Sequence, residues 1–456
     1  MKKRIVSLLF TAVFLAVCLI PSAGLLITGG AQAGANEVLA PLPRLRGADG
    51  ALNGAYLTGL ADFVNDRFFL RQECVTAWSG LNAKVLRTSA VRDVILGSDG
   101  WLYYAPTLAD YTRSEPMTER ELWCAARSLA LLQEYVEGRG GQFLFTVAPD
   151  KSSLYGGHMP DYPRGGGESN ARALAALLRE ADVPYLDLFA LFEGQDETLY
   201  FPTDSHWNGR GAALAADAVL SALGRDGGYF YGGFLPGEHR GDLYEMLYPA
   251  GEKTDLDWTY APGYTFTGSS ANPDSITLKT ACAAGSGSLL MFRDSFGRNL
   301  YPYLAESFAE AVFSRKNDYG PAAMADGGAV VIELVERNLR YLNLYPPTLP
   351  AAERDAGLAE GAVPAGSVVL SGKDAQDSYV NFLGAFEQIT PDADSPVYVL
   401  AGGTLYEAAP TPEGFSVWLP AASAEKELQI IITSEGTAVS LTGVKETDHL
   451  STGGKP

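Results

Sequence analysis

The spacing of hydrophobic positions changes several times along the chain, and each spacing predicts a different kind of element. Apolar runs typical of buried strands, such as Phe143–Val147, alternate with amphipathic helical segments, one of which starts at a capping box formed by Thr118 and Glu121. Strands and helices that alternate in this way are typical of a parallel sheet flanked by helices. We therefore expect an α/β domain over residues 91–345.

The same pattern predicts the other elements of this domain. A hairpin is expected around Asp99-Gly100, and Asn208 is a good N-cap for the helix that follows it. Residues 227–286 show no clear periodicity, and we interpret them as an insertion or a long loop packed over the sheet. The remaining expected elements are a helix through Leu174–Leu178, strands at 185–188, 288–292, 311–313 and 329–332, and a helix through Leu300–Phe308.

After residue 345 the pattern changes to short β-prone runs separated by Gly, Pro and Asp. Residues 346–366 are predicted to be a linker, residues 367–445 a small C-terminal all-β sandwich domain, and residues 446–456 a loose tail. The aromatic side chains Tyr398, Tyr406 and Trp418 fit either a sugar-stacking face or the sandwich core. We favour the core, which is the commoner place for aromatic side chains in strands.

The N-terminus has the character of an export signal. A basic start, Lys2-Lys3-Arg4, precedes a long apolar stretch, and Ala31-Gln32-Ala33 fits a signal-peptidase site. Residues 1–33 are therefore predicted to be either a cleaved signal peptide or a membrane anchor, followed at 34–90 by a tether and a helical lead-in. In both cases the rest of the chain is expected to be extracytoplasmic.

Composition narrows the possible functions. A chain of 456 residues with 47% hydrophobic and 19% charged residues describes a globular protein. The net charge of −20, without a cluster of Lys and Arg after the N-terminus, argues against a nucleic-acid partner. The exported part holds Cys74, Cys124 and Cys282, enough for one disulfide, and no His/Cys cluster has metal-ligand spacing. We expect neither a metal nor a cofactor.

Two short stretches together supply the parts of a Ser-His-Asp triad. Asp204 precedes His206 by two residues in a loop, a spacing that lets the carboxylate orient the imidazole, and Ser295 follows a predicted buried strand. The junction between a parallel strand and its helix exposes a side chain beside free backbone N–H groups, which suit an oxyanion. Each stretch alone also fits a simple helix cap or turn.

Further candidates lie near the same predicted sheet edge. Arg298 and Tyr301, on the helix after Ser295, are candidates for substrate binding, as is Lys151 at a strand end. Asp150 and Glu333 also stand at strand ends. Each of the five equally fits a cap, a surface charge or an ion pair.

Several motifs of this chain occur together in one known family. They are Gly97–Tyr103, Asn65–Phe68, Thr203–Trp207 with Gly211-Ala212, Gly241–Leu243 and Asp294–Phe296. The set resembles the SGNH-hydrolase-like proteins of alginate O-acetylation (the AlgX and AlgJ type) and the related DHHW proteins, over about residues 36–342. The resemblance implies an SGNH-hydrolase-like α/β fold. It also implies acetyl transfer to an exported polysaccharide by Ser295, His206 and Asp204, with a membrane-bound O-acyltransferase as partner supplying acetyl groups.

Two positions depart from the pattern of these relatives. Ser205 stands where the DHHW name implies His, and Arg293 stands where ordinary esterases of the wider superfamily have Gly before Asp-Ser. The second departure leaves the oxyanion donors open. Two alternatives to the acetyltransferase are a carbohydrate esterase with the same triad and a non-catalytic polysaccharide-binding or assembly protein. The sequence does not separate transfer to a sugar from transfer to water.

Overall fold

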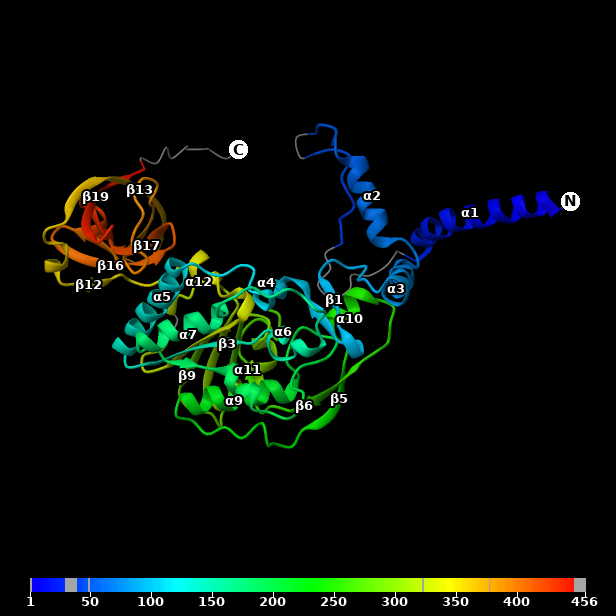
Figure 1. Cartoon of the computed structure of the whole chain (residues 1–456), viewed down its shortest axis with the longest axis horizontal. Coiled ribbons are helices and arrows are strands. Elements are labelled where there is room, and N and C mark those ends of the chain that lie inside the picture. The colour runs from blue at the N-terminus through cyan, green and yellow to red at the C-terminus, as the bar shows by residue number, and fades with distance from the viewer. Residues whose placement is uncertain (1, 29–38, 48–49, 322–323, 377, 447–456) are drawn as a thin grey trace.

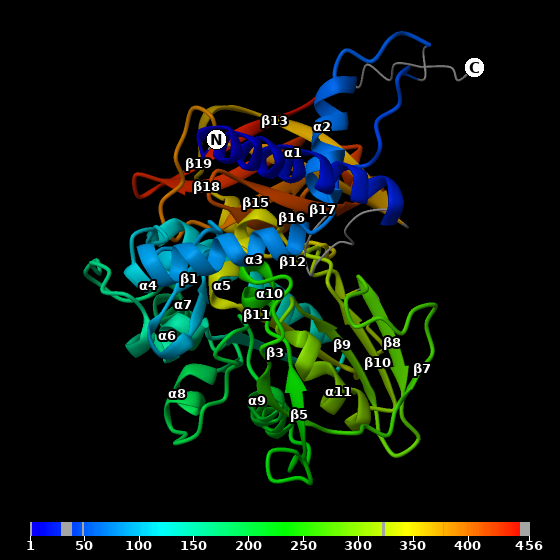
Figure 2. The same cartoon turned by 90° about the vertical axis from the view of Figure 1, so that its right-hand side faces the viewer.

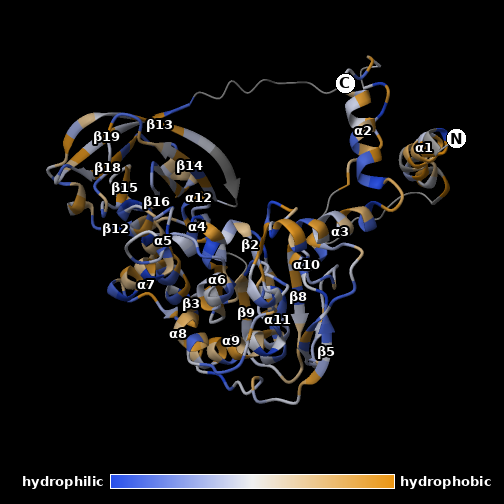
Figure 3. Cartoon of the chain, turned by 45° about the vertical axis from the view of Figure 1, so that its right-hand side comes forward, coloured by the Kyte–Doolittle hydropathy of each residue, from blue (hydrophilic) through white to orange (hydrophobic). Residues whose placement is uncertain are grey.

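The computed structural model of this chain describes residues 2–28, 39–47, 50–321, 324–376 and 378–446. Its first element, α1 (Lys2–Thr28), contains the stretch Arg4–Leu25, which is long and apolar enough to cross a membrane, a property that signal sequences share. Figure 3 shows α1 beside α2, standing away from the α/β domain and the C-terminal domain. The predicted cleavage triplet Ala31-Gln32-Ala33 lies outside the described residues.

Two helices, α2 (Tyr56–Arg67) and α3 (Arg71–Leu81), form the predicted helical lead-in, and a π-helical turn, Asn82–Leu86, continues α3. The side of α3 that packs inward is polar, because Ser79 is buried, whereas Trp78 is 58% exposed. Leu81 at the end of α3 and Val85 in the π-helical turn are also exposed. The turn between α2 and α3 contacts α1, since the backbone N–H of Phe69 donates to the carbonyl of Pro21 (3.1 Å).

A seven-stranded sheet forms the centre of the α/β domain (Figures 1 and 2). Its order is β4-β3-β11-β9-β10-β8-β7, and the first five of these strands run parallel. The two last strands are antiparallel additions at one edge. The strands are β3 (Gln142–Ala148), β4 (Tyr185–Leu186), β7 (Thr265–Phe266), β8 (Thr277–Ala281), β9 (Ser288–Phe292), β10 (Glu310–Ser314) and β11 (Ala329–Val335).

Helices cover both faces of this sheet, and a hydrophobic core lies under each. The helices α9 (Gly209–Ala222) and α11 (Gly297–Ser307) pack on one face, and α5 (Glu119–Gly138) and α7 (Asn170–Glu180) on the other. The predicted capping box of Thr118 and Glu121 starts α5, and Asn208 caps α9 through Gly211. Shorter helices are α4 (Leu108–Thr112), α6 (Lys151–Leu154), α8 (Leu188–Glu193) and α12 (Tyr341–Leu344). The expected parallel, helix-flanked sheet is therefore present.

The hairpin expected around Asp99-Gly100 forms from β1 (Val94–Leu96) and β2 (Leu102–Tyr104). The segment 227–286, which the sequence left without assigned elements, also has regular structure. It contains a second hairpin, β5 (Leu235–His239) with β6 (Asp255–Thr259), the short helix α10 (Asp242–Leu247), and the sheet strands β7 and β8. We call residues 227–286 the inserted segment.

The C-terminal domain is a closed barrel, which corrects the predicted β-sandwich. Seven strands follow one another around it as β16-β15-β18-β19-β13-β14-β17, and β17 pairs again with β16. The strands are β13 (Val363–Gln376), β14 (Tyr379–Ala385), β15 (Val397–Ala401), β16 (Thr404–Thr411), β17 (Gly414–Pro420), β18 (Leu428–Ser434) and β19 (Thr437–Lys445), with the short helix α13 (Ala421–Ala424). One half of β16 pairs with β15 and the other with β17, a closure that strand spacing in the sequence does not reveal.

The barrel packs directly on α5 of the α/β domain. Glu407 accepts two hydrogen bonds from Arg127 (2.6 and 2.7 Å) and one from Arg354 (2.6 Å), and its own side chain is buried. The strand β12 (Ala352–Arg354), within the predicted linker 346–366, pairs with β16, so part of that stretch is ordered against the barrel. Tyr406 lies in the barrel core, as predicted, whereas Trp418 is buried outside that core cluster and Tyr398 is half-buried.

Candidate active site

The candidate residues gather at the carboxyl edge of the parallel sheet. Asp150 follows β3, Asp294 and Ser295 follow β9, and Glu336 follows β11, and these three strands are neighbours in the sheet. The carboxyl ends of parallel strands meet at one edge, where helices begin and backbone N–H groups are free to bind ligands. The site therefore forms where open α/β sheets generally bind their ligands.

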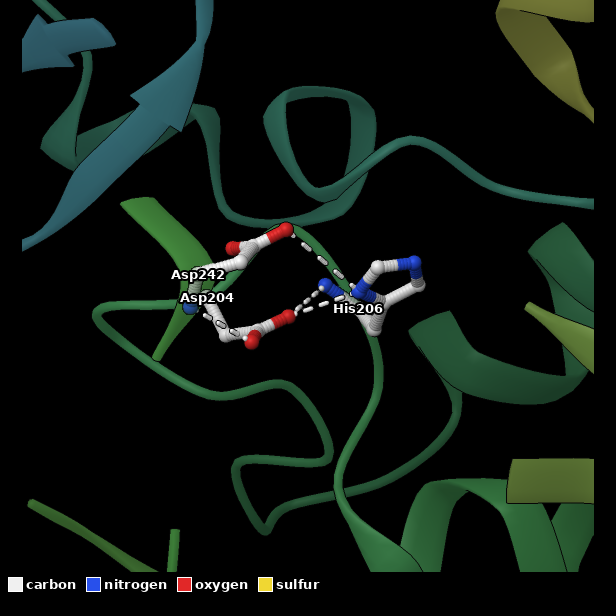
Figure 4. A group of neighbouring side chains, drawn as sticks. All are labelled: Asp204, His206 and Asp242. Carbon is white, nitrogen blue, oxygen red and sulfur yellow. Dashed lines mark hydrogen bonds and ion pairs between the residues drawn. The ribbon is translucent and has the colours of Figure 1, made fainter. Parts of the chain in front are cut away.

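Asp204 and His206 form the expected pair in the loop before α9. Asp204 Oδ1 accepts hydrogen bonds from His206 Nδ1 (2.7 Å) and from the His206 backbone N–H (2.9 Å), so the two-residue spacing closes a tight turn. Figure 4 shows the carboxylates of Asp204 and Asp242 on the Nδ1 side of the ring, with the other ring nitrogen pointing away from them. That nitrogen, Nε2, is inaccessible to solvent and has no hydrogen-bond partner among the described residues.

Ser205, at the first departure from the family pattern, takes part in the same network. Its Oγ donates to Asp242 Oδ2 (2.6 Å) and lies 3.2 Å from His206 Nδ1, and its backbone N–H donates to Asp242 Oδ1 (2.8 Å). Asp242 Oδ2 is 3.8 Å from His206 Nδ1. A hydroxyl at position 205 therefore links the imidazole to a second carboxylate, which the inserted segment provides.

The inserted segment also supplies a second imidazole. His239, at the end of β5, lies with its Nε2 2.8 Å from Asp204 Oδ2, and the backbone N–H of Asp242 donates to the same oxygen (2.9 Å). Asp255 accepts hydrogen bonds from the N–H and hydroxyl of Thr203 (2.8 and 2.7 Å). The motif Gly241–Leu243 indicated only a resemblance, and His239 carried no signal, because their role depends on contacts with a distant loop.

The electrostatics of this loop follow from its crowded charges. Burial alone would raise the pKa of Asp204, but His206 and His239 outweigh it and hold that pKa well below its usual range. Burial alone would lower the pKa of His206, but Asp204 and Asp242 outweigh it and raise that pKa above its ordinary value. Burial and the neighbouring Asp204 charge raise the pKa of Asp242. An ionised Asp204 therefore strengthens the imidazole as a proton acceptor, which favours general-base catalysis once His206 is neutral.

Lys151 lies beneath this loop and not in an opening where a substrate would contact it. Its ammonium is buried and donates to the backbone carbonyls of Phe201 (3.0 Å), Pro202 (3.0 Å) and Asp204. Trp101 and Tyr103 from the β1–β2 hairpin cover the ammonium with their rings. Burial lowers the pKa of Lys151 to about 7, against the opposing charges of nearby carboxylates. This geometry gives Lys151 a structural role and no support for the predicted substrate contact.

Ser295 stands in the short turn between β9 and α11 and is half-buried. The preceding Asp294 fixes this turn, because its Oδ1 accepts from the backbone N–H of Phe296 (2.9 Å). Its Oδ2 accepts from the N–H of Val335 (2.7 Å) and the amide of Asn338 (3.0 Å). Asp294 therefore joins the candidate nucleophile's turn to the end of the neighbouring strand β11.

Two buried side chains, Glu333 and Arg293, support the same turn. Glu333 Oε2 accepts from the backbone N–H of Asp294 (3.3 Å), and burial together with the Asp294 charge raises the pKa of Glu333 well above its usual range. Arg293, at the second departure from the family pattern, donates to the carbonyl of Pro273 (2.5 Å) and lies over the ring of Tyr301. Arg293 therefore ties the turn to the inserted segment.

The two candidate stretches meet at the residues next to Ser295 and His206. The ring of Phe296 lies against the imidazole of His206, with centroids 4.9 Å apart. Trp207 Nε1 donates to the carbonyl of Phe296 (3.1 Å), and Asn299 Nδ2 donates to the carbonyl of Trp207 (3.1 Å). The predicted meeting of the two stretches is present, but His206 Nε2 makes no hydrogen bond to Ser295 in this structure.

The two candidates on α11 lie in different environments. Tyr301 is buried, packs against Phe313, and its hydroxyl accepts a hydrogen bond from Tyr264 (3.3 Å), so it belongs to the core under the sheet. Arg298 is exposed and lies 3.7 Å from Asp274 of the inserted segment. Of the two, only Arg298 is placed at the surface.

Arg337, which no motif in the sequence indicated, brings a cation close to the site. Its guanidinium donates to Asp150 Oδ1 (2.5 Å) and lies over the rings of Phe296 and Tyr104. Its side chain is 13% exposed. A cation at this position favours negative charge that develops near Phe296. Its position just after the strand β11 was the one feature of the sequence that could have indicated Arg337 as a site residue.

Metal binding and disulfide formation find little support among the described residues. Asp204, His206 and Asp242 bring ligand atoms within 4.8 Å of one another, but the oxygens of both carboxylates already accept the hydrogen bonds described above. Cys74, Cys124 and Cys282 are free thiols, so the disulfide that the sequence allowed does not form.

Comparison with known proteins finds one matching family and related proteins. Residues 94–256 match the family described as SGNH hydrolase-like domain, acetyltransferase AlgX. A probable alginate O-acetylase AlgJ of Pseudomonas syringae pv. tomato is 25% identical over 178 residues, which cover 38% of this chain and 44% of that protein. This chain therefore spans less than half the length of that relative.

Two solved structures are also similar to this chain. The O-acetyltransferase domain of Pseudomonas putida AlgJ is 18% identical with a TM-score of 0.37, over 54% of this chain and 92% of that one. A DHHW family protein from Eubacterium siraeum is 17% identical with a TM-score of 0.38, over 49% of this chain and 90% of that one. The family match at residues 94–256, which includes Asp204 and His206 and ends before Ser295, confirms the resemblance to the SGNH-hydrolase-like proteins of alginate O-acetylation.

Proposed function

We propose that this protein is an extracytoplasmic O-acetyltransferase that acts on an exported polysaccharide through Ser295, His206 and Asp204. One observation carries the proposal: His206 turns Nδ1 to an ionised carboxylate and leaves Nε2 unpartnered while its ring lies against Phe296, the residue after Ser295. A general base for serine needs one ring nitrogen oriented by a carboxylate and the other free to accept the hydroxyl proton. The similarity to a probable alginate O-acetylase supports acetyl as the transferred group.

The reaction proceeds in two balanced steps. Ser295 Oγ attacks the carbonyl carbon of the acetyl donor while its proton passes to His206 Nε2, and the donor's alcohol leaves with that proton. A sugar hydroxyl then gives its proton to the same nitrogen and attacks the acetyl-serine, and Ser295 Oγ leaves and regains the proton. Asp204 stabilises the imidazolium in both steps, and the N-terminus of α11 favours the oxyanion.

Activity assays on two variants test this mechanism. Ser295→Ala and His206→Ala are each expected to lower kcat for acetyl transfer to an oligosaccharide at least about 10³-fold, because triad members act as a unit. Ser434→Ala in the barrel, whose hydroxyl donates to the carbonyl of Thr390, serves as the matched control. Undiminished transfer by Ser295→Ala would contradict the proposal.

The same assay separates the two other functions. Free acetate released equally with and without oligosaccharide would identify a carbohydrate esterase that uses the same residues with water as acceptor. A serine-directed probe that leaves Ser295 unlabelled while glycan binding persists would identify a non-catalytic binding protein. Acetylated sugar formed in preference to acetate is the result expected for the transferase.

We also propose that α1 is retained as an anchor in the cytoplasmic membrane, where a membrane-bound O-acyltransferase supplies acetyl groups. The exposed apolar side chains Trp78, Leu81 and Val85 of α3 and the π-helical turn support this, because they suit a lipid surface and the turn before α3 is hydrogen-bonded to Pro21 of α1. N-terminal sequencing of the exported protein tests the proposal. An intact start at Met1 or Lys2 is expected, and a start after Ala33 would exclude the anchor.

A further inference from the structure

The carboxylate of Asp204 is shared between two histidines, of which the proposed reaction uses only His206. Its Oδ1 faces His206 Nδ1 (2.7 Å) and its Oδ2 faces His239 Nε2 (2.8 Å). Two backbone N–H groups, from His206 and Asp242, complete the set at 2.9 Å each. Because each oxygen accepts from two donors, the carboxylate cannot rotate without breaking both pairs.

His239 is itself held in place by the inserted segment. Its ring stacks on Phe201 with centroids 4.1 Å apart and planes inclined by 22°. Its strand β5 pairs with β6 so that His239 lies opposite Asp255, the residue that accepts both hydrogen bonds from Thr203. The same hairpin therefore fixes the second histidine and the start of the loop that carries Asp204.

We propose that His239 is a positioning residue for the pair of Asp204 and His206. It donates a hydrogen bond from Nε2 to Asp204 Oδ2, which fixes the carboxylate with Oδ1 facing His206. The same hydrogen bond moderates how strongly the carboxylate stabilises a proton on His206. A donor at one oxygen withdraws charge from the other oxygen, so it weakens the pull on His206. The catalytic role of His239 rests on the proposed function, whereas the coupling between the two imidazoles follows from their contacts with Asp204.

Other charges face these imidazoles and stay constant in the test below. Asp242 on α10 and Arg337 after β11 act on His206, and Asp257 on β6 and Asp242 act on His239. Lys151 contacts the carbonyl of Asp204 from below. Substituting His239 alone leaves all of these groups in place, so a change in the His206 titration reports on the contact between His239 and Asp204.

Histidine titration by NMR tests the proposal directly, because the chain has four histidines. In His239→Phe, which removes the donor, the pKa of His206 is expected to rise by roughly 0.5–1 unit, the equivalent of one hydrogen bond. His239→Gln, whose amide can still donate to Oδ2, is expected to shift it less. His158→Gln is the matched control, since His158 stacks on Trp101 and contacts Ser98 outside this network.

The outcomes separate the inference from the proposed function. An unchanged or lowered His206 titration in both folded His239 variants would overturn the inference, and so would an equal shift in His158→Gln. If acetyl transfer is confirmed, the acid limb of the kcat/KM profile in His239→Phe should move to higher pH by the same amount. If Ser295→Ala retains full activity, the proposed function fails, while the NMR titration still decides the coupling.

Discussion

The loop that carries His206 and the turn that carries Ser295 are held in opposite ways. The loop is held by charged side chains from a separate inserted segment: Asp242, His239 and Asp255 all contact residues 203–206. The turn is held from within the sheet, where Asp294 accepts from the end of β11 and Glu333 lies buried underneath. The serine side therefore depends mainly on groups at the sheet, with one contact through Arg293 to the inserted segment, whereas the histidine side depends on charged groups of the inserted segment and on Lys151.

This difference predicts different responses to pH. Asp204 has a lowered pKa, so it adds stability above its unfolded pKa of about 3.9 and loses it as pH falls through the folded value. His206 and His239 have raised pKa values, so their contribution is full below about pH 6.5 and is lost as pH rises through the folded values. Glu333 has a raised pKa and opposes folding once ionised. Three substitutions test how the histidine loop and the serine turn are held.

The largest effect is expected from Lys151→Met, which removes the donor under the histidine loop. Three backbone carbonyls would lose a hydrogen-bond donor, so the free energy of unfolding should fall by about 3 kcal/mol or more. Chemical denaturation measures this change. The exposed Lys316→Met is the control and should change stability by less than about 0.5 kcal/mol. A loss for Lys151→Met as small as the control's would show that the loop does not depend on the ammonium.

An intermediate effect is expected from Asp294→Asn on the serine side. An asparagine amide cannot accept hydrogen bonds from all three donors as the carboxylate does. The free energy of unfolding should therefore fall by about 2–3 kcal/mol. The labelling of Ser295 by a serine-directed probe should also slow, because the turn loses its anchor to β11. Asp274→Asn, which removes only a surface contact with Arg298, should change neither measurement appreciably. Equal results for the two variants would refute the role given to Asp294.

An effect that is smallest at low pH and grows as pH rises is expected from Glu333→Gln. Because the folded pKa of Glu333 lies above its unfolded value of about 4.3, ionisation costs the folded state increasingly as pH rises. Relative to the wild type, the variant should therefore gain stability with rising pH, by at most about 1.4 kcal/mol per pH unit, and gain none below pH 4. Denaturation curves between pH 4 and 8 measure the difference, and a constant difference would contradict a raised pKa.

Local patterns in the sequence predicted most of the sheet and its caps. The capping box at Thr118, the cap at Asn208 and the hairpin at Asp99-Gly100 all form as expected, because each depends on residues a few positions apart. The barrel was wrongly predicted as a sandwich, because closure depends on which distant strand pairs with β16. Lys151 and Tyr301 were selected by their position at strand and helix ends, but packing buries both.

The sequence by itself determined the parts of the candidate site that adjacent residues create. Asp204 and His206 find each other across one intervening residue, and Ser295 follows a strand whose apolar run is plain in the sequence. Only the tertiary structure decided what surrounds them, because His239, Asp242 and Arg337 come from segments separated from the loop by between about 30 and 130 residues. Contacts over such separations depend on chain topology, and no local periodicity encodes which buried charges come to share a carboxylate.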